Sequence, residues 1–530
     1  MLTDKLIDFA ATVYRIISRD AQKAAQTVTV DRSWQLPTLE ARGFRRAGGG
    51  YAAVVEGPTE FSASSQQVAG FFPFCVGSSA PMVGVPLGRN LINGQTVTGD
   101  PISYYLQKLI SAPSALVMAL NGRGKSSLVV RMALGVADAG FLVMALGDSK
   151  GEYRAVVQEL DGQVIEVGPE MDAVNPLDAG PLWERLGEIR ALDEKNGTRF
   201  SQQLEAQIHS RRLFTVQSLF RISGDNVARQ VANDSMLLSL GIHEAAARCV
   251  AEQPPRQPLL SDVKTAITEG TPAMHKAMLS ENEEEYRQAS KPMILALNLF
   301  GADGPFGDVF ARQTTTPIKV DRSVDIDISA VRESQNKNLL AAVQIVCWSY
   351  GQAAVSAAKT LHRVGLMREL HYFLVLDELW QILEADPQLV RYINEYTKLN
   401  RTIGLGQILI THSPKDLVFK DEELTSIARG FVERSPMKFY GALARNDMEA
   451  LNDAMPMTEA EKDQLVDWSP EGVMDPISRK VSPPIGRGKF LMKVGQGPGV
   501  PFQVTLTAKE HEIHDTNEAW SQAFEHAGTL

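Results

Sequence analysis

The sequence contains few cysteines, and they follow no pattern. Cys75, Cys249 and Cys347 are the only three in 530 residues, and no two of them have the spacing of a metal-binding or redox pair. A disulfide framework is therefore excluded, and this cysteine usage suits a reducing compartment. We expect a cytoplasmic protein.

A long apolar run is also absent. A membrane-spanning helix needs about 18 or more consecutive apolar residues, and the most apolar candidate, residues 71–86, is interrupted by Gly, Ser and Pro. The first 25 residues have an amphipathic helix pattern with acidic residues, and they lack the apolar core and cleavage site of a secretion signal. The chain is expected to have no transmembrane segment of its own, so any membrane attachment would run through a partner.

Positive charge is not in excess. The formal net charge is −10 and the sequence pI is about 5.5, so the overall field does not draw the molecule to DNA or to an anionic membrane. Hydrophobic residues make up 44% and charged residues 22%, as in soluble globular proteins. A chain of 530 residues is longer than one ordinary core requires, which predicts either a large domain with insertions or two to three domains.

The pattern of apolar segments predicts an α/β fold, a mostly parallel sheet flanked by helices. From Ser114 the chain alternates apolar strand, Gly-rich turn, helix and apolar strand. Strand character returns at Ile318–Ile328, followed by a helix over Asn336–Lys359. The predicted organisation is an N-terminal helix with a small strand-rich region (1–100), the first part of the α/β domain (101–180), an all-helical insertion (181–300), the second part (301–510) and a C-terminal helix (511–530).

The segment from Ala119 to Ser126, ALNGRGKS, lies between a predicted strand and a predicted helix, the context that a phosphate-binding P-loop requires. Gly122 and Gly124 would let backbone N–H groups turn toward phosphate oxygens. Lys125 would reach the β and γ phosphates of ATP, and Ser126 would be a ligand of Mg²⁺. The first position is Ala where the strict pattern has Gly, and the alternative is a Gly-rich turn without a ligand. The predicted nucleotide-binding residues are Asn121, Gly122, Arg123, Gly124, Lys125, Ser126 and Ser127.

A second motif follows the apolar segment 373–376, where the acids Asp377 and Glu378 end a predicted strand. This is a Walker B pattern, in which Asp377 would organise Mg²⁺ and Glu378 would orient or deprotonate the attacking water. The alternative is that these two acids are only solvated residues at the end of a strand. The P-loop elsewhere in the sequence favours the Walker B interpretation. The helical insertion accounts for the long interval between the two motifs.

Three further segments make the sequence resemble a known family. They are GDSKGEY at 147–153, VNPLD at 174–178 and GLGQILITHSPKDL at 404–417. Together with the two Walker motifs, and in this order, they resemble the motor domain of the conjugation ATPases typified by VirB4 and TraC, within the FtsK and HerA P-loop superfamily. The resemblance extends over most of the chain, although the region before Gly84 is shorter than the family's N-terminal domain.

The resemblance implies a RecA-like P-loop ATPase that uses ATP and Mg²⁺ and assembles as a homo-oligomer, a hexamer. Such a motor powers substrate transfer or pilus biogenesis with other secretion-system subunits, on the cytoplasmic face of the inner membrane. DNA is a further partner to consider. Two alternatives stay open: a DNA translocase of the HerA or FtsK kind, and a nucleotide-binding assembly module with little turnover.

The resemblance also assigns roles to individual residues. The family carries a sensor Gln where this chain has His412, so His412 would sense the γ phosphate or the water; a structural hydrogen bond is the alternative. Arg401 matches a family arginine that acts as an arginine finger across the subunit boundary. The alternative is a solvated Arg at the end of a helix. Lys150 and Glu152 would support the nucleotide site, or else form a loop ion pair.

Two other features carry no function in this reading. His511 and His514 are spaced as i and i+3 and have acidic neighbours, but no Cys and no further His stands nearby in the sequence to complete a metal site. The acidic run Glu281–Glu285 is interpreted as a solvated helix face, with a docking patch as the alternative.

Overall fold

The chain in the computed structural model divides into two units, Met1–Cys75 and Val76–Leu530. The residues that the structure describes are 39–40, 43–44, 79–224, 227, 234–333, 335–385, 390, 404–449, 457–472 and 484–514. In the first unit β1 (Leu39–Glu40) pairs antiparallel with β2 (Gly43–Phe44). The helix expected at the N-terminus lies outside the described residues. All motifs of the predicted site fall in the second unit.

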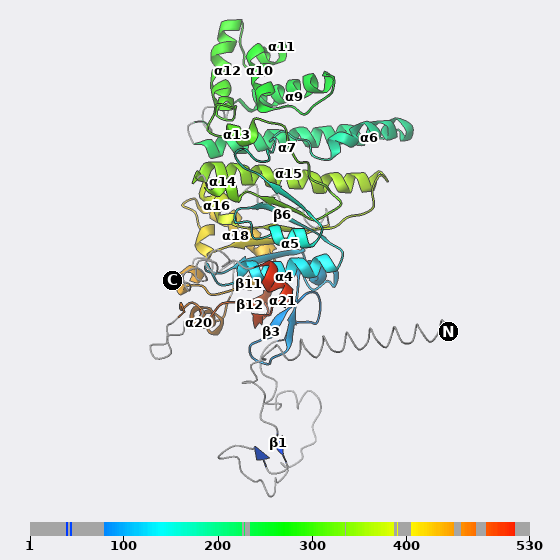
Figure 1. The fold of residues 1–530 in the computed structure, drawn as a ribbon. Coiled ribbons are helices and arrows are strands. Elements are labelled where there is room, and N and C mark those ends of the chain that lie inside the picture. The colour runs from blue at the N-terminus through cyan, green and yellow to red at the C-terminus, as the bar shows by residue number, and fades with distance from the viewer. Residues whose placement is uncertain are drawn as a thin grey trace, which may run out of the picture. The chain divides into compact units, whose positions relative to one another are not determined.

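The second unit is organised around one sheet of eleven strands, in the order β4-β3-β13-β12-β11-β5-β10-β9-β6-β8-β7 (Figure 1). The seven strands from β11 to β7 are mutually parallel. The other four continue the sheet as antiparallel strands. The bounds are β3 Pro86–Asn90, β4 Thr96–Thr98, β5 Ser114–Met118, β6 Leu142–Asp148, β7 Gln163–Glu166, β8 Val324–Asp327, β9 Tyr372–Leu376, β10 Leu405–Thr411, β11 Met437–Tyr440, β12 Lys489–Val494 and β13 Val500–Val504.

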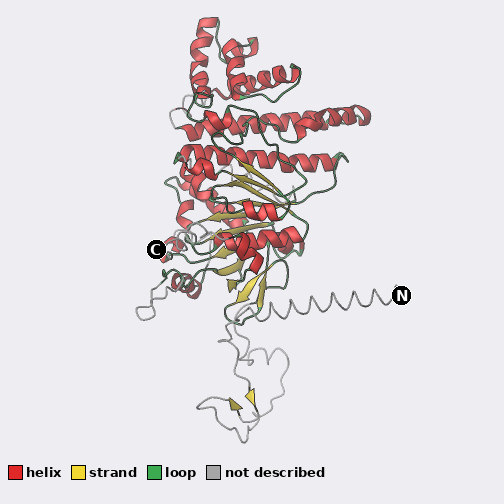
Figure 2. Cartoon of the chain, in the orientation of Figure 1, coloured by secondary structure: helices red, strands yellow, loops and turns green. Residues whose placement is uncertain are grey.

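Helices cover the parallel part of the sheet, which explains why its strands are apolar throughout (Figure 2). Every residue of β5, β9 and β10 is buried. Successive β5 residues face different cores: Leu116 belongs to the core that includes α15 (Lys337–Arg363), and Val117 to the core that includes α4 (Lys125–Asp138). The predicted fold class, a mostly parallel α/β sheet flanked by helices, is confirmed.

Between β7 and β8 the described residues are helical for most of their length and form the green layers of Figure 1. The helices are α6 Leu182–Asn196, α7 Phe200–Ser223, α9 Ser235–Ala251, α10 Leu260–Glu269, α11 Pro272–Ala277, α12 Glu283–Asn298 and α13 Gly307–Phe310. The remaining helical elements are α3 Pro101–Leu106, α5 Arg154–Glu159, α14 Ser329–Glu333, α16 Leu379–Ala385, η4 Pro414–Leu417, α18 Glu422–Arg434, α19 Arg445–Glu449, α20 Glu459–Asp467 and α21 Ala508–Ile513.

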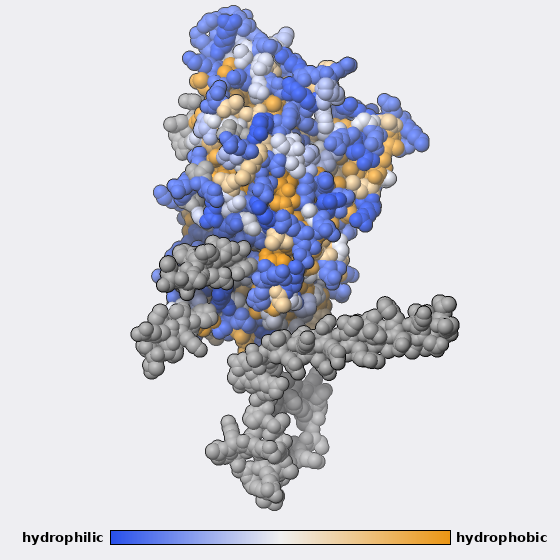
Figure 3. Space-filling model, in the orientation of Figure 1, coloured by the Kyte–Doolittle hydropathy of each residue, from blue (hydrophilic) through white to orange (hydrophobic). Residues whose placement is uncertain are grey.

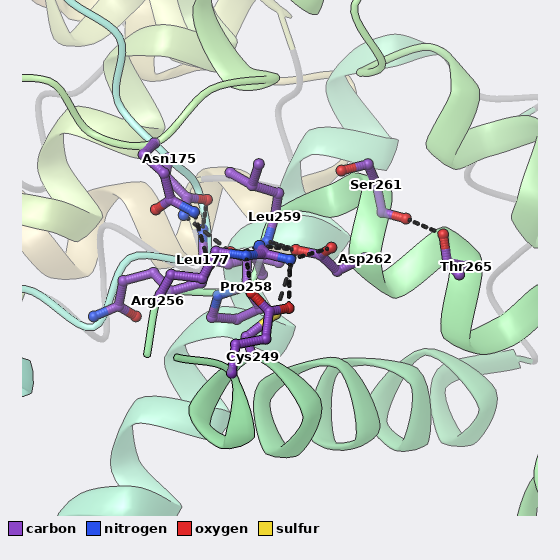
Figure 4. Close-up of polar contacts among 12 residues, drawn as sticks. Asn175, Leu177, Cys249, Arg256, Pro258, Leu259, Ser261, Asp262 and Thr265 are labelled. Carbon is purple, nitrogen blue, oxygen red and sulfur yellow. Dashed lines mark hydrogen bonds and ion pairs between the residues drawn. The ribbon is translucent and has the colours of Figure 1, made fainter. Parts of the chain in front are cut away.

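The motif VNPLD joins the sheet to this helical region. The Asn175 amide donates to the carbonyl of Pro258 at 2.9 Å, and its oxygen accepts from the backbone N–H of Leu177. The Pro258 segment is in turn anchored by Arg256, whose guanidinium donates to both carboxylate oxygens of Asp262 at 2.6 and 2.9 Å (Figure 4). Entry to the helical region and the loop between α9 and α10 are therefore bound together at one point.

The strand expected over Ile318–Ile328 is shorter in the structure and covers only Val324–Asp327. Residues 320–322 form a turn and a bend instead, because Asp321 and Ser323 favour turns over strands. Strands β7 and β11, each four residues long, were not expected from the sequence. Short strands are set by their pairing partners more than by their own pattern.

One helix among the described residues, α15, is long and apolar enough to cross a membrane. However, 89% of its most apolar window is buried inside the protein, as expected for a core helix. The face of the molecule in Figure 3 is mainly hydrophilic, with smaller hydrophobic areas between.

Strand β8 carries a buried acid with no partner. The Asp325 side chain is 0% exposed, and neither of its oxygens makes a hydrogen bond with a described residue. Burial raises its pKa well above the usual value, and the nearby charges of Asp148 and Asp327 add to the effect. A protonated, neutral carboxyl is therefore the favoured form at Asp325.

This predicts a pH-dependent contribution to stability. Because the folded pKa is raised, the contribution is present at acidic pH and is lost as pH rises above the unfolded value of about 4, by up to about 1.4 kcal/mol per pH unit. Asp325→Asn should remove this dependence. The difference in melting temperature, variant minus wild type, should be more positive at pH 8 than at pH 5. A difference that does not change with pH would contradict a protonated Asp325.

Candidate functional site

The loop between β5 and α4 has the backbone that phosphate binding requires. Gly122 and Gly124 have φ angles of +70° and +89°, a region that side chains disfavour. A Cβ on Gly124 would also lie 3.3 Å from the backbone of Gly488. Within the described part of the chain, the backbone N–H groups of Gly122, Arg123 and Gly124 donate no hydrogen bond. Three donors at the start of a helix are thus left for an anion.

Lys125, the first residue of α4, is folded back over this loop. Its ammonium group donates to the carbonyl of Ala119 at 2.8 Å and lies 3.2 Å from Nδ1 of His412. Burial lowers the pKa of Lys125 to about 8, although the charge of Glu378 acts in the opposite direction. The lysine therefore lies in a low-dielectric site, where a negatively charged ligand would raise its pKa.

Asp377 directly follows strand β9, and both its carboxylate and its backbone carbonyl accept hydrogen bonds. Its carboxylate accepts from the hydroxyl of Tyr153 at 3.0 Å and from the backbone N–H of Glu378 at 2.7 Å. The Gln344 side chain on α15 donates to its carbonyl at 3.0 Å. Burial raises the pKa of Asp377 to about 7, and the adjacent negative charge of Glu378 contributes to this shift. A cation at this carboxylate would reverse the shift, because it favours the ionised form.

Glu378 has a strained backbone and a tightly held carboxylate. Its φ angle is +52°, which costs about 1–3 kcal/mol for a residue other than Gly and is typical of functional sites. The carboxylate contacts the ammonium of Lys150, the indole N–H of Trp380 and, at 2.6 Å, Nε2 of His412. Burial by itself would raise the pKa of Glu378, but the hydrogen bond from His412 and the charge of Lys150 hold it well below the usual value. Glu378 is thus a charged acceptor at neutral pH.

His412 follows strand β10, which lies between the strands of the two Walker motifs. Because an ammonium group has no acceptor atom, Nδ1 accepts from Lys125 and the N–H at Nε2 donates to Glu378. The backbone here is fixed by Asp416, whose carboxylate accepts from the hydroxyl of Thr411 at 2.6 Å and from the N–H of His412 at 3.2 Å. One imidazole ring therefore connects the P-loop lysine to the Walker B glutamate.

Arg123 lies in the loop, but its side chain turns away from the phosphate cavity. It is 1% exposed and donates to the carbonyl of Ser469 at 2.7 Å and to the carboxylate of Glu471 at 2.8 Å. Its own carbonyl accepts from the N–H of Gly488 at 2.9 Å. The backbone N–H is what Arg123 offers to a nucleotide, while its guanidinium attaches the loop to the segment that follows α20.

A cavity of about 310 Å³ lies against the loop. Its lining residues are Asn121, Gly122, Gly124, Lys125, Ser126, Ser127, Lys150, Glu152, Pro484, Arg487 and His514. Six of the seven predicted nucleotide-binding residues line it, and Arg123 does not. Lys150 pairs with Glu378 in place of Glu152. In the described structure, Glu152 Oε2 is buried without a hydrogen-bond partner, so an acceptor is left inside the cavity.

These observations fit a nucleotide with Mg²⁺. Ser126 lies in the first turn of α4 beside Lys125, and Asp377 would supply the second oxygen that a P-loop metal site needs. Mg²⁺ keeps several waters and takes few protein ligands. The other candidate metal ligands, His511 and His514, are not part of a metal cluster, since the described residues contain no group of three His, Cys, Asp or Glu that could hold an ion.

Sequence reasoning missed three residues of the site. Trp380 follows the Walker B acids by two positions, Tyr153 ends the motif GDSKGEY, and Gln344 is the one polar side chain in the run LLAAVQIV of α15. That isolated polar residue in an apolar helix was a usable signal. Arg401, the predicted finger, lies outside the described residues.

The comparisons with known proteins concern the fold. No family model and no curated protein sequence matches the chain. Among solved structures, VirB4 of Thermoanaerobacter pseudethanolicus is similar over 82% of this chain and 100% of that one, with 18% identity and a TM-score of 0.58. The plasmid coupling protein TrwB, in complex with the non-hydrolysable ATP analogue ADPNP, covers 81% of this chain and 96% of that one, with 12% identity and a TM-score of 0.43. The chain has the fold of VirB4, as its motifs predict.

Proposed function

We propose that this protein is an ATP-hydrolysing motor of a type IV secretion or conjugation system, which powers substrate transfer or pilus biogenesis. The observation that carries the proposal is the chain of contacts from Lys125 through His412 to Glu378, which joins a P-loop to a Walker B pair. The fold shared with VirB4 supports the choice of system.

Each residue then has a role in hydrolysis. The N–H groups of the loop and Lys125 bind the phosphates. Ser126 and Asp377 would hold Mg²⁺, which would supply positive charge beside the transferring phosphoryl group. Glu378 accepts the proton of the attacking water as the general base. On nucleotide binding Lys125 turns to the phosphates and leaves Nδ1 of His412. The contact between His412 and Glu378 then depends on whether a nucleotide is bound. Lys150, beside Glu378 and inside the cavity, adds a second positive charge.

The assay that tests this proposal is steady-state ATP hydrolysis by the full chain, with and without DNA. We expect Mg²⁺-dependent turnover that double-stranded DNA changes by less than about twofold, because the net charge of −10 offers no general attraction for DNA. Strong stimulation by DNA would favour the alternative, a translocase of the HerA or FtsK kind. ATP binding without measurable turnover would favour an assembly module.

Assembly and location complete the proposal. We propose a homo-oligomer, a hexamer, in which Arg401 of one subunit reaches the nucleotide of the next and offsets charge in the transition state. The ring would act on the cytoplasmic face of the cell membrane, attached through other secretion-system subunits. Proposed cofactors are ATP and Mg²⁺.

A further inference from the structure

Helix α9 has apolar residues on an exposed face as well as on its buried face. The buried face packs into the helical region through Leu237, Leu238, Gly241, Ile242, Ala245 and Cys249. A second stripe, the α9 seam, consists of Met236, Leu240, His243, Ala247 and Val250, at intervals of four, three, four and three residues. Met236 and Val250 are 62% and 42% exposed, and His243 and Ala247 are exposed as well. Because a helix that is apolar all round is normally buried on every side, the seam indicates an interaction surface.

This surface carries little charge. The charged residues of α9 are Glu244 and Arg248, and they form an ion pair with each other at 2.8 Å. On the neighbouring helices, Arg190 of α6 pairs with Glu205 of α7 at 2.7 Å. Since these charges already have partners of opposite sign, the surface selects neither an acidic nor a basic partner. It suits another apolar helix face.

A cavity of about 380 Å³ lies along the seam. Helix α9 lines it with His243, Ala247 and Val250, while α6 contributes Trp183 and α7 contributes Ile208. The seam therefore continues into a groove whose walls come from three helices. A helix laid on the seam would also contact the apolar side chains of α6 and α7.

Contacts with α7 hold the seam in place. His209 on α7 lies with its Nε2 atom 2.8 Å from the hydroxyl of Ser239, and its ring is 6.0 Å from the ring of His243, in an edge-on arrangement. Further along the two helices, the Gln217 amide donates to the hydroxyl of Ser235 at 3.1 Å. Because α9 is held at both places, a partner would bind a preformed surface and lose little free energy in ordering it.

We propose that the α9 seam pairs with the same seam of a second copy of this chain, antiparallel and about a two-fold axis at His243. Intervals of four and three residues are those of helices that pack side by side in a coiled coil. The symmetry places Met236 opposite the partner's Val250. It also places Leu240 opposite the partner's Ala247, so a large side chain faces a small one, as interdigitation requires. At the axis, one neutral imidazole can donate an N–H to the other.

The size of the seam sets the expected strength of the pairing. From Met236 to Val250 the seam is about 21 Å long, at a rise of about 1.5 Å per helical residue. With a helix diameter of about 10 Å, its footprint is about 200 Å², whereas stable dimers bury about 800 Å² on each partner. We therefore expect a transient dimer with a dissociation constant of about 1–100 μM.

The pairing of α9 is independent of the proposed function. Figure 1 shows α9 in the green layers, apart from α4 and the phosphate-binding loop. The contact involves neither a nucleotide nor Arg401, so it is measured on the full chain without ATP. Failure of the pairing would leave the proposed ATPase untouched, and an inactive ATPase would leave the pairing untouched.

A single cysteine tests the two-fold axis, because a residue on the axis meets its own copy. In a full chain that also carries Cys75→Ser, His243→Cys should form a disulfide-linked dimer on mild oxidation. Cys249 and Cys347 are buried and should not compete. The matched control is Glu284→Cys on the exposed start of α12. His243→Cys should give at least about tenfold more dimer than this control, because a disulfide forms only between Cα atoms within about 7 Å.

A charge in the seam should abolish the pairing. Met236→Glu would place a carboxylate between the apolar faces, and it should reduce the disulfide-linked dimer of His243→Cys by at least about tenfold, through a weaker association. Its matched control is Met171→Glu, because Met171 is also exposed, at 46%, and lies outside α9. That variant should leave the yield of dimer unchanged.

Sedimentation velocity on chains that keep His243 is the second measurement. The sedimentation coefficient of wild type should rise with protein concentration more than that of Met236→Glu. Identical sedimentation of the two would overturn the inference. So would a His243→Cys thiol that reacts with a soluble reagent but forms no dimer, an equal yield from Glu284→Cys, or a dimer that persists with Met236→Glu. Circular dichroism establishes that each variant is folded.

Discussion

Glu378→Gln should bind ATP normally and hydrolyse it slower by a factor of about 10² to 10⁴, the loss expected when a general base is removed. The substitution keeps the shape of the side chain and its ability to accept from His412 and Trp380, and it removes the charge and the proton acceptor. The measurements are ATP affinity by calorimetry and phosphate release at saturating ATP. Unchanged turnover would transfer the catalytic role to another acid.

The matched control is Glu284→Gln, which removes one negative charge from the exposed start of α12. Its turnover should equal that of wild type. The pKa of Glu378 is held below the usual range by His412 and Lys150 against the effect of burial, so the base is ionised throughout the neutral range. Turnover at saturating ATP should therefore not fall between pH 8 and pH 6 through protonation of Glu378.

Lys125→Ala should lower the affinity for ATP by at least about 100-fold. The ammonium would make charge-assisted hydrogen bonds to two phosphates, worth about 1.5–3 kcal/mol each. Folding should be little affected, because Lys125 bonds to carbonyls of its own loop in the nucleotide-free site. The control is Lys319→Ala, an exposed lysine far from the loop in sequence. Retained micromolar affinity would refute the P-loop assignment.

The same lysine gives a pH dependence. Because the pKa of Lys125 is lowered to about 8 by burial, its free form loses its proton as pH rises through that value. Phosphate binding restores the charge, so binding must take up a proton at higher pH. ATP affinity should be constant below about pH 7.5 and fall by up to about tenfold per pH unit above about pH 8.

Mixing variants tests whether a neighbouring subunit completes the site. Arg401→Ala and Lys125→Ala chains should each be poorly active, and the mixture should recover part of the turnover because each supplies the half-site that the other lacks. Wild-type turnover per chain should also rise with protein concentration as subunits associate. Mixed oligomers that stay as inactive as either variant would rule out a finger in trans at Arg401.

The local structure of the two Walker patterns was predictable because each pattern lies within a short segment of the chain. A P-loop needs glycines at fixed spacing between a strand and a helix, and Gly122 and Gly124 have the positive φ angles that this turn requires. The strand before Asp377 is buried from end to end, as its apolar run indicates. The short strand β11 was not predicted, because its four residues form a strand through pairing with β5 and β12.

The electrostatic arrangement around these motifs could not be read from the sequence. Lys150 pairs with Glu378, whereas the sequence offered a supporting role at the nucleotide or a loop ion pair with Glu152. Arg123 was expected at the nucleotide, and its guanidinium instead binds the Ser469 segment. The Lys150 contact depends on which strands are neighbours: β6 pairs with β9, so Lys150, which follows β6, comes close to Glu378, which follows β9. The Arg123 contact depends on the segment after α20, which is distant in sequence.

The sequence by itself determined the fold class, and it supplied the proposed phosphate-binding and Walker B residues, because strand, turn and helix patterns are encoded by residues close together in the chain. The tertiary structure alone decided how Asp377 is held by Tyr153 and Gln344, and how β13 and α21 come to lie beside the loop. Those contacts arise from the antiparallel return of the last strands onto the parallel sheet. Pairing across hundreds of residues is set by the packing of the whole core, which no local pattern specifies.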